Sequence, residues 1–146
     1  MKKIFSIVLI AAITSFFMAA CTPDEDIDPD DNTDVRDAIE GLWQVDENAN
    51  PTSKSDKIFY QVYIEPDTST ANEILISNFY QLGMQFYAVG KVTERAIRID
   101  PQEIGGGYYI EGNGTITSDY KTINWDYTVD PGDGMMQVQA LYTKDE

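Results

Sequence analysis

The stretch "KIFYQVYIE", residues 57–65, decides the fold class, because its side chains alternate between two faces with a period of two. One face carries Ile58, Tyr60, Val62 and Ile64, and the other carries Phe59, Gln61 and Tyr63. A period of two is typical of a β-strand, whereas a helix repeats every 3.6 residues. The stretch therefore predicts a strand with one face directed toward a core.

The same alternation extends through the rest of the chain. It is clear over 108–116, 123–129 and 136–142, and shorter strands are expected over 42–47, 73–80, 85–92 and 96–100. The connecting stretches, such as "PDTSTAN", "EIGGG" and "DPGDG", are rich in the residues that tight turns require. About eight short strands with no helix between them predict an all-β fold, an antiparallel up-and-down meander that closes into a small barrel. A β-sandwich is the alternative.

The sequence of the N-terminal region predicts an export signal. Lys2 and Lys3 precede an apolar run that ends in small residues, which predicts a signal peptide over residues 1–20. The stretch Met18-Ala19-Ala20-Cys21 resembles the lipobox of bacterial lipoproteins, and this resemblance implies that Cys21 carries the lipid. Cys21 is the only cysteine, so no intrachain disulfide can form. The alternative is an ordinary secreted protein with a free thiol.

An acidic segment follows Cys21 and predicts a disordered tether over residues 21–37, before a barrel domain at 38–146. Its position resembles the export signal of Bacteroidota-type surface lipoproteins, which implies an outer membrane protein anchored at the cell surface. The rival interpretation is a calcium loop, because Asp26, Asp28, Asp30 and Asp37 approach the spacing of an EF-hand. The turn position that needs glycine holds Asp31 instead.

Charge and composition exclude several classes of function. The chain carries a formal net charge of −15, and removal of Lys2 and Lys3 with a signal peptide leaves eight basic against 25 acidic residues, or −17. Nucleic acid is therefore not an expected partner, since phosphate binding needs a basic face. The absence of histidine removes the usual ligands of zinc, copper and haem and the usual catalytic bases, and we expect no cofactor or metal. Only carboxylate chemistry or calcium stays open.

Two short motifs are similar to those of lipocalins. Asp34 can cap a short helical turn that runs through Ile39 and is ended by Gly41. Gly41-Leu42-Trp43 follows this turn, as the lipocalin Gly-x-Trp motif does at the start of the first strand. Ser118-Asp119-Tyr120 is similar to the lipocalin Thr-Asp-Tyr motif before the seventh strand. The resemblance implies that Trp43 plugs one end of the barrel. Lipocalins stack an arginine on this tryptophan, and here the corresponding region offers Lys144.

The side chains expected inside the barrel are the candidates for ligand binding. An eight-stranded barrel is either filled by its own side chains or holds one small ligand. The bulky inward set consists of Trp43, Tyr60, Tyr108, Trp125, Tyr127 and Tyr142. Either these residues form a packed core, or their hydroxyls favour a flat or polar ligand such as a sugar or an aromatic metabolite.

A second candidate surface lies on the outward faces. If the first, second and eighth strands are neighbours, an exposed apolar patch would consist of Leu42, Phe59, Tyr63, Met135 and Leu141. Such a patch would bind a partner protein, unless residues 33–40 cover it. The expected function is a non-catalytic binding or interaction module for a small ligand, a glycan or an outer-membrane protein. The alternatives are a structural surface protein with a filled barrel and a carboxylate-based glycan-active enzyme.

Overall fold

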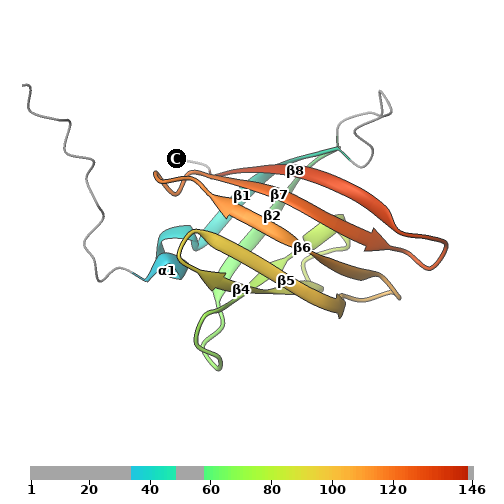
Figure 1. Ribbon diagram of the computed structural model, residues 1–146, viewed down its shortest axis with the longest axis horizontal. Coiled ribbons are helices and arrows are strands. Elements are labelled where there is room, and N and C mark those ends of the chain that lie inside the picture. Colours follow the sequence, from blue (N-terminus) through green and yellow to red (C-terminus); the bar gives the residue numbers. More distant parts are fainter. Residues whose placement is uncertain (1–33, 49–57, 145–146) are drawn as a thin grey trace, which may run out of the picture. The chain divides into compact units, whose positions relative to one another are not determined.

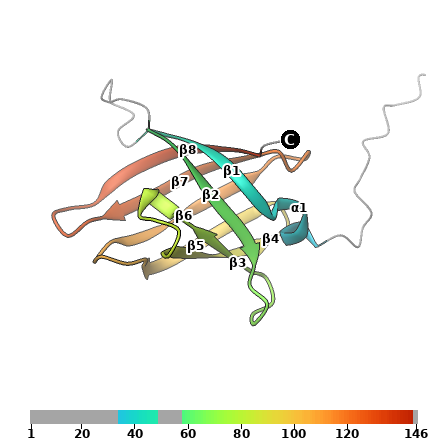
Figure 2. The ribbon, with the colours of Figure 1, turned by 180° about the vertical axis from the view of Figure 1, so that it is seen from behind.

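The protein forms a closed β-barrel (Figures 1 and 2), which the computed structural model describes over residues 34–48 and 58–144. A short helix precedes the barrel, and a 3-10 turn connects its third and fourth strands. The elements in chain order are α1 (Val35–Ile39), β1 (Gly41–Asn48), β2 (Ile58–Pro66), β3 (Glu73–Ser77), η1 (Phe79–Gln81), β4 (Tyr87–Thr93), β5 (Ala96–Glu103), β6 (Tyr109–Ile116), β7 (Thr122–Asp130) and β8 (Met136–Lys144).

The strand order confirms the predicted fold class. Each strand pairs antiparallel with the next one along the chain, and β1 pairs with β8 to close the ring. Closure leaves no free sheet edge, which is how an up-and-down meander satisfies the backbone groups of its outer strands. The sandwich alternative is wrong, because all eight strands belong to one continuous sheet.

The barrel interior is the hydrophobic core. Along each strand every second side chain points inward, so the alternation in "KIFYQVYIE" becomes the buried series Tyr60, Val62 and Ile64 of β2. Ile58, the first residue of this series, lies at the rim and is partly exposed. Isoleucine and valine are the most frequent buried residues, and the large aromatic side chains among the buried ones are Trp43, Tyr60, Phe79, Trp125, Tyr127 and Tyr142.

Helix α1 covers the end of the barrel at which the described chain begins, here called the closed end (Figure 1). The Asp34 side chain accepts a hydrogen bond from the Arg36 backbone N–H at 3.0 Å, so the predicted helix start is confirmed. Ile39 is fully buried against the core. Ordered structure that packs on the barrel therefore begins N-terminal to residue 38, inside the segment predicted as tether.

Trp43 links α1 to the closed end of the barrel. Its indole Nε1 donates to the Ile39 carbonyl at 2.8 Å, and its side chain is completely buried. Lys144 completes this arrangement: its Nζ donates to the Ala38 carbonyl at 2.8 Å and lies 5.8 Å from the centre of the Trp43 ring. A lysine thus supplies the cation that stacks on the tryptophan, the role that the lipocalin resemblance assigns to an arginine.

The opposite end, here called the open end, holds the β3–β4, β5–β6 and β7–β8 connections, together with the end of β1 and the start of β2. The predicted strand 73–80 is wrong in its second half, because β3 ends at Ser77 and the backbone of Asn78 is left-handed at φ 63°. The Asn78 side chain supports this turn. Its Nδ2 donates to the Gln61 carbonyl at 2.6 Å, and its Oδ1 accepts from the Gly83 N–H at 2.7 Å.

The β4–β5 pair is the least regular part of the ring. Its register covers only Lys91 to Thr93 on β4, and a bulge interrupts β5 between Ile99 and Gln102. Pro101 lies in this bulge, where its missing N–H is tolerated. The Gln102 side chain replaces the hydrogen bonds that the ladder loses here. Its Oε1 accepts from the Val89 N–H, and its Nε2 donates to the Val89 carbonyl, both at 2.8 Å.

Candidate functional site

A carboxylate lies inside the barrel near its open end. Alternation along β1 directs Trp43, Val45 and Glu47 inward, and Glu47 is only 2% exposed. Among residues 34–48 and 58–144, Glu47 is the only charged side chain that is buried. Burial of an ionised group is costly unless partners compensate it, so this position needs an explanation beyond packing.

Two tyrosine hydroxyls bind the Glu47 carboxylate. Tyr127 Oη donates to Glu47 Oε2 at 2.8 Å, and Tyr60 Oη donates to the same oxygen. Burial raises the pKa of Glu47, and the two hydrogen bonds oppose this rise. Burial also raises the pKa values of Tyr60 and Tyr127, so both hydroxyls keep their protons and act as neutral donors.

Two further polar groups in the interior have no hydrogen-bond partner. They are Tyr142 Oη and Trp125 Nε1, and both side chains are at least 97% buried. Burial raises the pKa of Tyr142 and the nearby Tyr60 opposes this rise, yet no hydrogen bond of ordinary geometry joins the two hydroxyls. Buried polar groups without partners are rare in folded proteins and cost about 1–3 kcal/mol each. Both groups therefore point to a missing partner inside the barrel.

Aromatic rings form the walls around these groups. The Trp125 ring lies 5.5 Å from that of Tyr142, and Tyr127 follows two residues later on β7, also inward. β6 makes room for them with glycines, because Gly112 pairs with Tyr127 and Gly114 pairs with Trp125. A Cβ on Gly114 would lie 3.0 Å from the Trp125 ring, and one on Gly112 would clash with Tyr127.

The β3–β4 connection covers this aromatic region from the open end. Phe79 of η1 is completely buried, with its ring centre 4.9 Å from Tyr127 and 5.9 Å from Trp125. The next residue, Tyr80, has a left-handed backbone at φ 54°, as Gln81 does at φ 57°. Residues other than glycine adopt this conformation at a cost, which is often found at functional sites.

The interior residues predicted from the sequence separate into three positions. Tyr60, Trp125, Tyr127 and Tyr142 surround Glu47 or the groups without partners, as described above. Trp43 lies at the closed end, where it is bonded to α1. Tyr108 is only half-buried: it precedes β6 in a connection at the open end, where its ring is 6.0 Å from that of Tyr80. β6 therefore begins one residue later than expected, at Tyr109, and Tyr108 packs against the core from the connection before it.

Sequence reasoning missed Glu47 and Phe79. The alternation that directs Trp43 inward also directs Glu47 inward, so this signal was present. Phe79 had no such signal. Continuing the phase of the buried Ile74 and Ile76 would have put residue 79 on the outer face, and only the left-handed turn at Asn78 sends its ring inward.

The outward residues predicted as a partner patch are spread over the barrel surface. Leu42 pairs with Tyr63 near the closed end, and Asp46 lies between Phe59 and Leu141 on the neighbouring strands. Met135 is in the β7–β8 connection at the open end. Phe59 and Met135 are the most exposed members, at 67% and 68%. The five side chains thus do not form one continuous apolar row.

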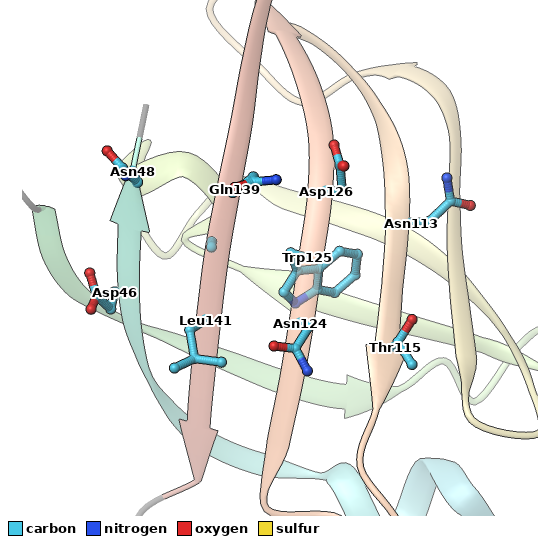
Figure 3. A pocket seen from close by; sticks show the side chains of 10 residues that line it. Asp46, Asn48, Asn113, Thr115, Asn124, Trp125, Asp126, Gln139 and Leu141 are labelled. Atoms are coloured by element: carbon cyan, nitrogen blue, oxygen red, sulfur yellow. The ribbon is translucent and has the colours of Figure 1, made fainter. Parts of the chain in front are cut away.

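A polar hollow of about 540 Å³ lies on the outer face of β1, β6, β7 and β8 (Figure 3). Asp46, Leu141, Asn124 and Thr115 cross it in one row, and Asn48, Gln139, Asp126 and Asn113 form the next. Most of these side chains are in contact with solvent, so their hydrogen bonds can be made with water. The interior cluster is the better candidate site, because its polar groups are shielded from water.

Comparison with known proteins leaves the fold and the site as the basis for assignment. No family model matches the sequence, and no curated protein matches it significantly. Over the described residues, no three carboxylates come close enough together to share a metal ion. The calcium loop considered above begins at Asp26, outside these residues.

Replacing Glu47 by glutamine is expected to change how stability depends on pH. The pKa of Glu47 is higher in the folded than in the unfolded state, so its ionisation destabilises the fold increasingly as pH rises from the unfolded pKa through the folded one. Relative to wild type, Glu47→Gln should therefore gain stability at neutral pH and lose that advantage as pH falls toward about 4.3. Urea unfolding of both proteins across this range measures the difference. A constant difference would show that Glu47 does not titrate as described.

Proposed function

We propose that this protein is a non-catalytic binding module that holds a small ligand inside the open half of its barrel. The observation that carries the proposal is that the barrel interior holds the buried Glu47 carboxylate and two buried polar groups, Tyr142 Oη and Trp125 Nε1, that have no partner. A barrel that served only as a scaffold would be more stable with apolar side chains at these positions. A ligand that supplies the missing hydrogen bonds gives them a reason.

A carboxylate-based enzyme fits this site less well. Glycoside hydrolysis needs two carboxyl groups about 5–9 Å apart. In the part of the chain that the structure describes, Glu47 has no second buried acid beside it. The tyrosine hydroxyls around it are also unsuited to act as bases, because burial raises their pKa values. The arrangement supports recognition rather than bond cleavage.

We further propose that the barrel is displayed as a lipocalin-like lipoprotein on the outer surface of a bacterial outer membrane. The lipobox-like sequence at Cys21 and the acidic residues after it support this localisation. The described chain enters the barrel through α1 at the closed end. The ligand site therefore lies at the end of the barrel opposite the point where the tether joins it.

Native mass spectrometry of the full chain, extracted gently from its source membrane, tests the binding function. We expect a small mass in addition to the acylated chain, and this mass should disappear when the protein is unfolded. The matched control is Tyr142→Ala with Trp125→Phe, which enlarges the interior but removes both polar groups. Recovery of the same mass with this variant, or of a bare chain from every preparation, would overturn the proposal.

A further inference from the structure

We propose that the ligand is a small organic cation, a flat aromatic or apolar body that carries an ammonium group, and that the ammonium pairs with Glu47. The inference rests on the binding function proposed above and specifies the chemistry of the ligand. It is carried by the unbalanced charge of Glu47, by the aromatic rings near it and by the position of the described lysines and arginines outside the interior.

Glu47 has hydrogen bonds but no cation. A carboxylate can accept about four hydrogen bonds, and the two tyrosine hydroxyls both use Oε2. None of the lysine and arginine side chains of the described residues is buried beside it. A buried charge is normally paired, because hydrogen bonds from neutral donors only partly replace its hydration. An ammonium group would supply the missing charge.

The rings next to Glu47 suit a cation as well as an apolar body. Trp125 and Tyr142 stand 5.5 Å apart at an interplanar angle of 49°, and Tyr127 both lines the wall and donates to Glu47. Ammonium groups are attracted to the faces of tryptophan and tyrosine within about 6 Å. Tyr142 Oη can accept a hydrogen bond from the ammonium, and Trp125 Nε1 can donate to an acceptor on the ligand body.

The described lysines and arginines all lie away from the interior. They are on α1, in the closed-end turns, at the end of β8, or on the outer faces of β4 and β5: Arg36, Lys91, Arg95, Arg98, Lys121 and Lys144. Lys91 and Arg98 are also both paired with Asp100. None of these described cations therefore neutralises Glu47.

Phe79 occupies the place that the ligand body would take. Its ring packs against Trp125 and Tyr127, and the connection that carries it contains the left-handed residues Asn78, Tyr80 and Gln81. Withdrawal of this single ring would expose the aromatic walls without moving any strand. Phe79 is therefore a plug that the ligand displaces.

Tyramine and tyrosol provide a matched pair of probes, because they share the same phenol body and differ in an ammonium and a hydroxyl group. Binding of each to the full chain is measured by calorimetry at neutral pH and high salt, which screens attraction to the acidic surface. The variants are Glu47→Gln and, as control, Asp46→Asn, which removes the same charge from the adjacent residue on the outer face. The anion 4-hydroxyphenylacetate serves as a third probe.

Tyramine should bind wild type and Asp46→Asn with equal affinity. Glu47→Gln should lower the affinity for tyramine about 30-fold or more, as loss of a buried charge pair does. Tyrosol should bind to wild type more weakly than tyramine does, and Glu47→Gln should leave the affinity for tyrosol unchanged. If Glu47→Gln does not fold, the test is made on wild type. Lowering the pH through the pKa of Glu47 should then weaken the binding of tyramine and leave the binding of tyrosol unchanged. The groups that face Glu47 are the tyrosines 60, 80, 127 and 142, which stay neutral over that range.

Equal affinities for tyramine and tyrosol, both unchanged by Glu47→Gln, would overturn the inference about charge and leave the binding function standing. Weaker tyramine binding in Asp46→Asn than in Glu47→Gln would also overturn it, because the cation would then bind the outer face. Failure of all three probes to bind, together with a bare chain in native mass spectrometry, would overturn both proposals.

Discussion

Replacing Trp43 by alanine is expected to lower the free energy of unfolding by about 3–5 kcal/mol, the usual cost of removing a large buried aromatic side chain. The ring is completely buried, and its Nε1 holds the Ile39 carbonyl of α1 at 2.8 Å. Its loss would open a cavity at the closed end, free the last turn of α1, and remove the ring beneath Lys144. Urea unfolding followed by far-ultraviolet circular dichroism measures the change.

Leu42→Ala is the matched control for this variant. Leu42 is the preceding residue of β1 and lies on the outer face at 40% exposure, so its truncation should cost less than about 1 kcal/mol. Equal losses of stability in the two variants would contradict the assignment of Trp43 as the side chain that closes this end.

Replacing Phe79 by alanine is expected to have two opposite effects. The free energy of unfolding should fall by about 3–5 kcal/mol, because a fully buried ring is removed from its contacts with Trp125 and Tyr127. Tyramine, however, should bind at least about tenfold more tightly, since it no longer has to displace the ring. Unfolding experiments and calorimetry measure the two effects separately.

Met84→Ala is the control in the same connection, because Met84 is 55% exposed and should change neither property appreciably. Tighter binding together with lower stability is the signature of a plug. If Phe79→Ala lowered both the stability and the affinity for tyramine, the ring would instead be part of the binding site.

The β-period of two explains how much of the structure could be predicted. It places Tyr60, Trp125, Tyr127 and Tyr142 inside the barrel, because a strand that faces solvent on one side has only two ways to orient its side chains. The same rule extended over β1 reaches Glu47, a residue that composition alone hides among 25 acidic side chains. Local periodicity is thus sufficient for residues on regular strands.

The connections could not be predicted in the same way. Phe79 and Tyr108 lie outside the strands, where the direction of a side chain depends on the backbone angles of a few residues and on long-range contacts. The side-chain amide of Asn78 forms hydrogen bonds with Gln61 and Gly83, which lie 17 and five residues away in the sequence. No pattern in the sequence predicts these hydrogen bonds. The open end of the barrel, which carries the proposed site, is for this reason the part that needed a structure.

Burial of Glu47 also has a consequence for the barrel without ligand. A desolvated carboxylate and two unpartnered polar groups weaken the fold, so a ligand that satisfies them should stabilise the protein through its binding free energy. Stability and function are thus linked through the same few side chains in the open half.

The indole N–H signals in a ¹H–¹⁵N correlation spectrum test the central claim most directly, because the chain has only two tryptophans. Trp125 Nε1 has no partner in the interior, whereas Trp43 Nε1 is bonded to Ile39 at the other end and serves as the internal reference. On titration with tyramine, the Trp125 signal should move and saturate while the Trp43 signal stays in place. A Trp125 signal that remains fixed at concentrations where calorimetry shows binding would contradict a ligand site inside the barrel.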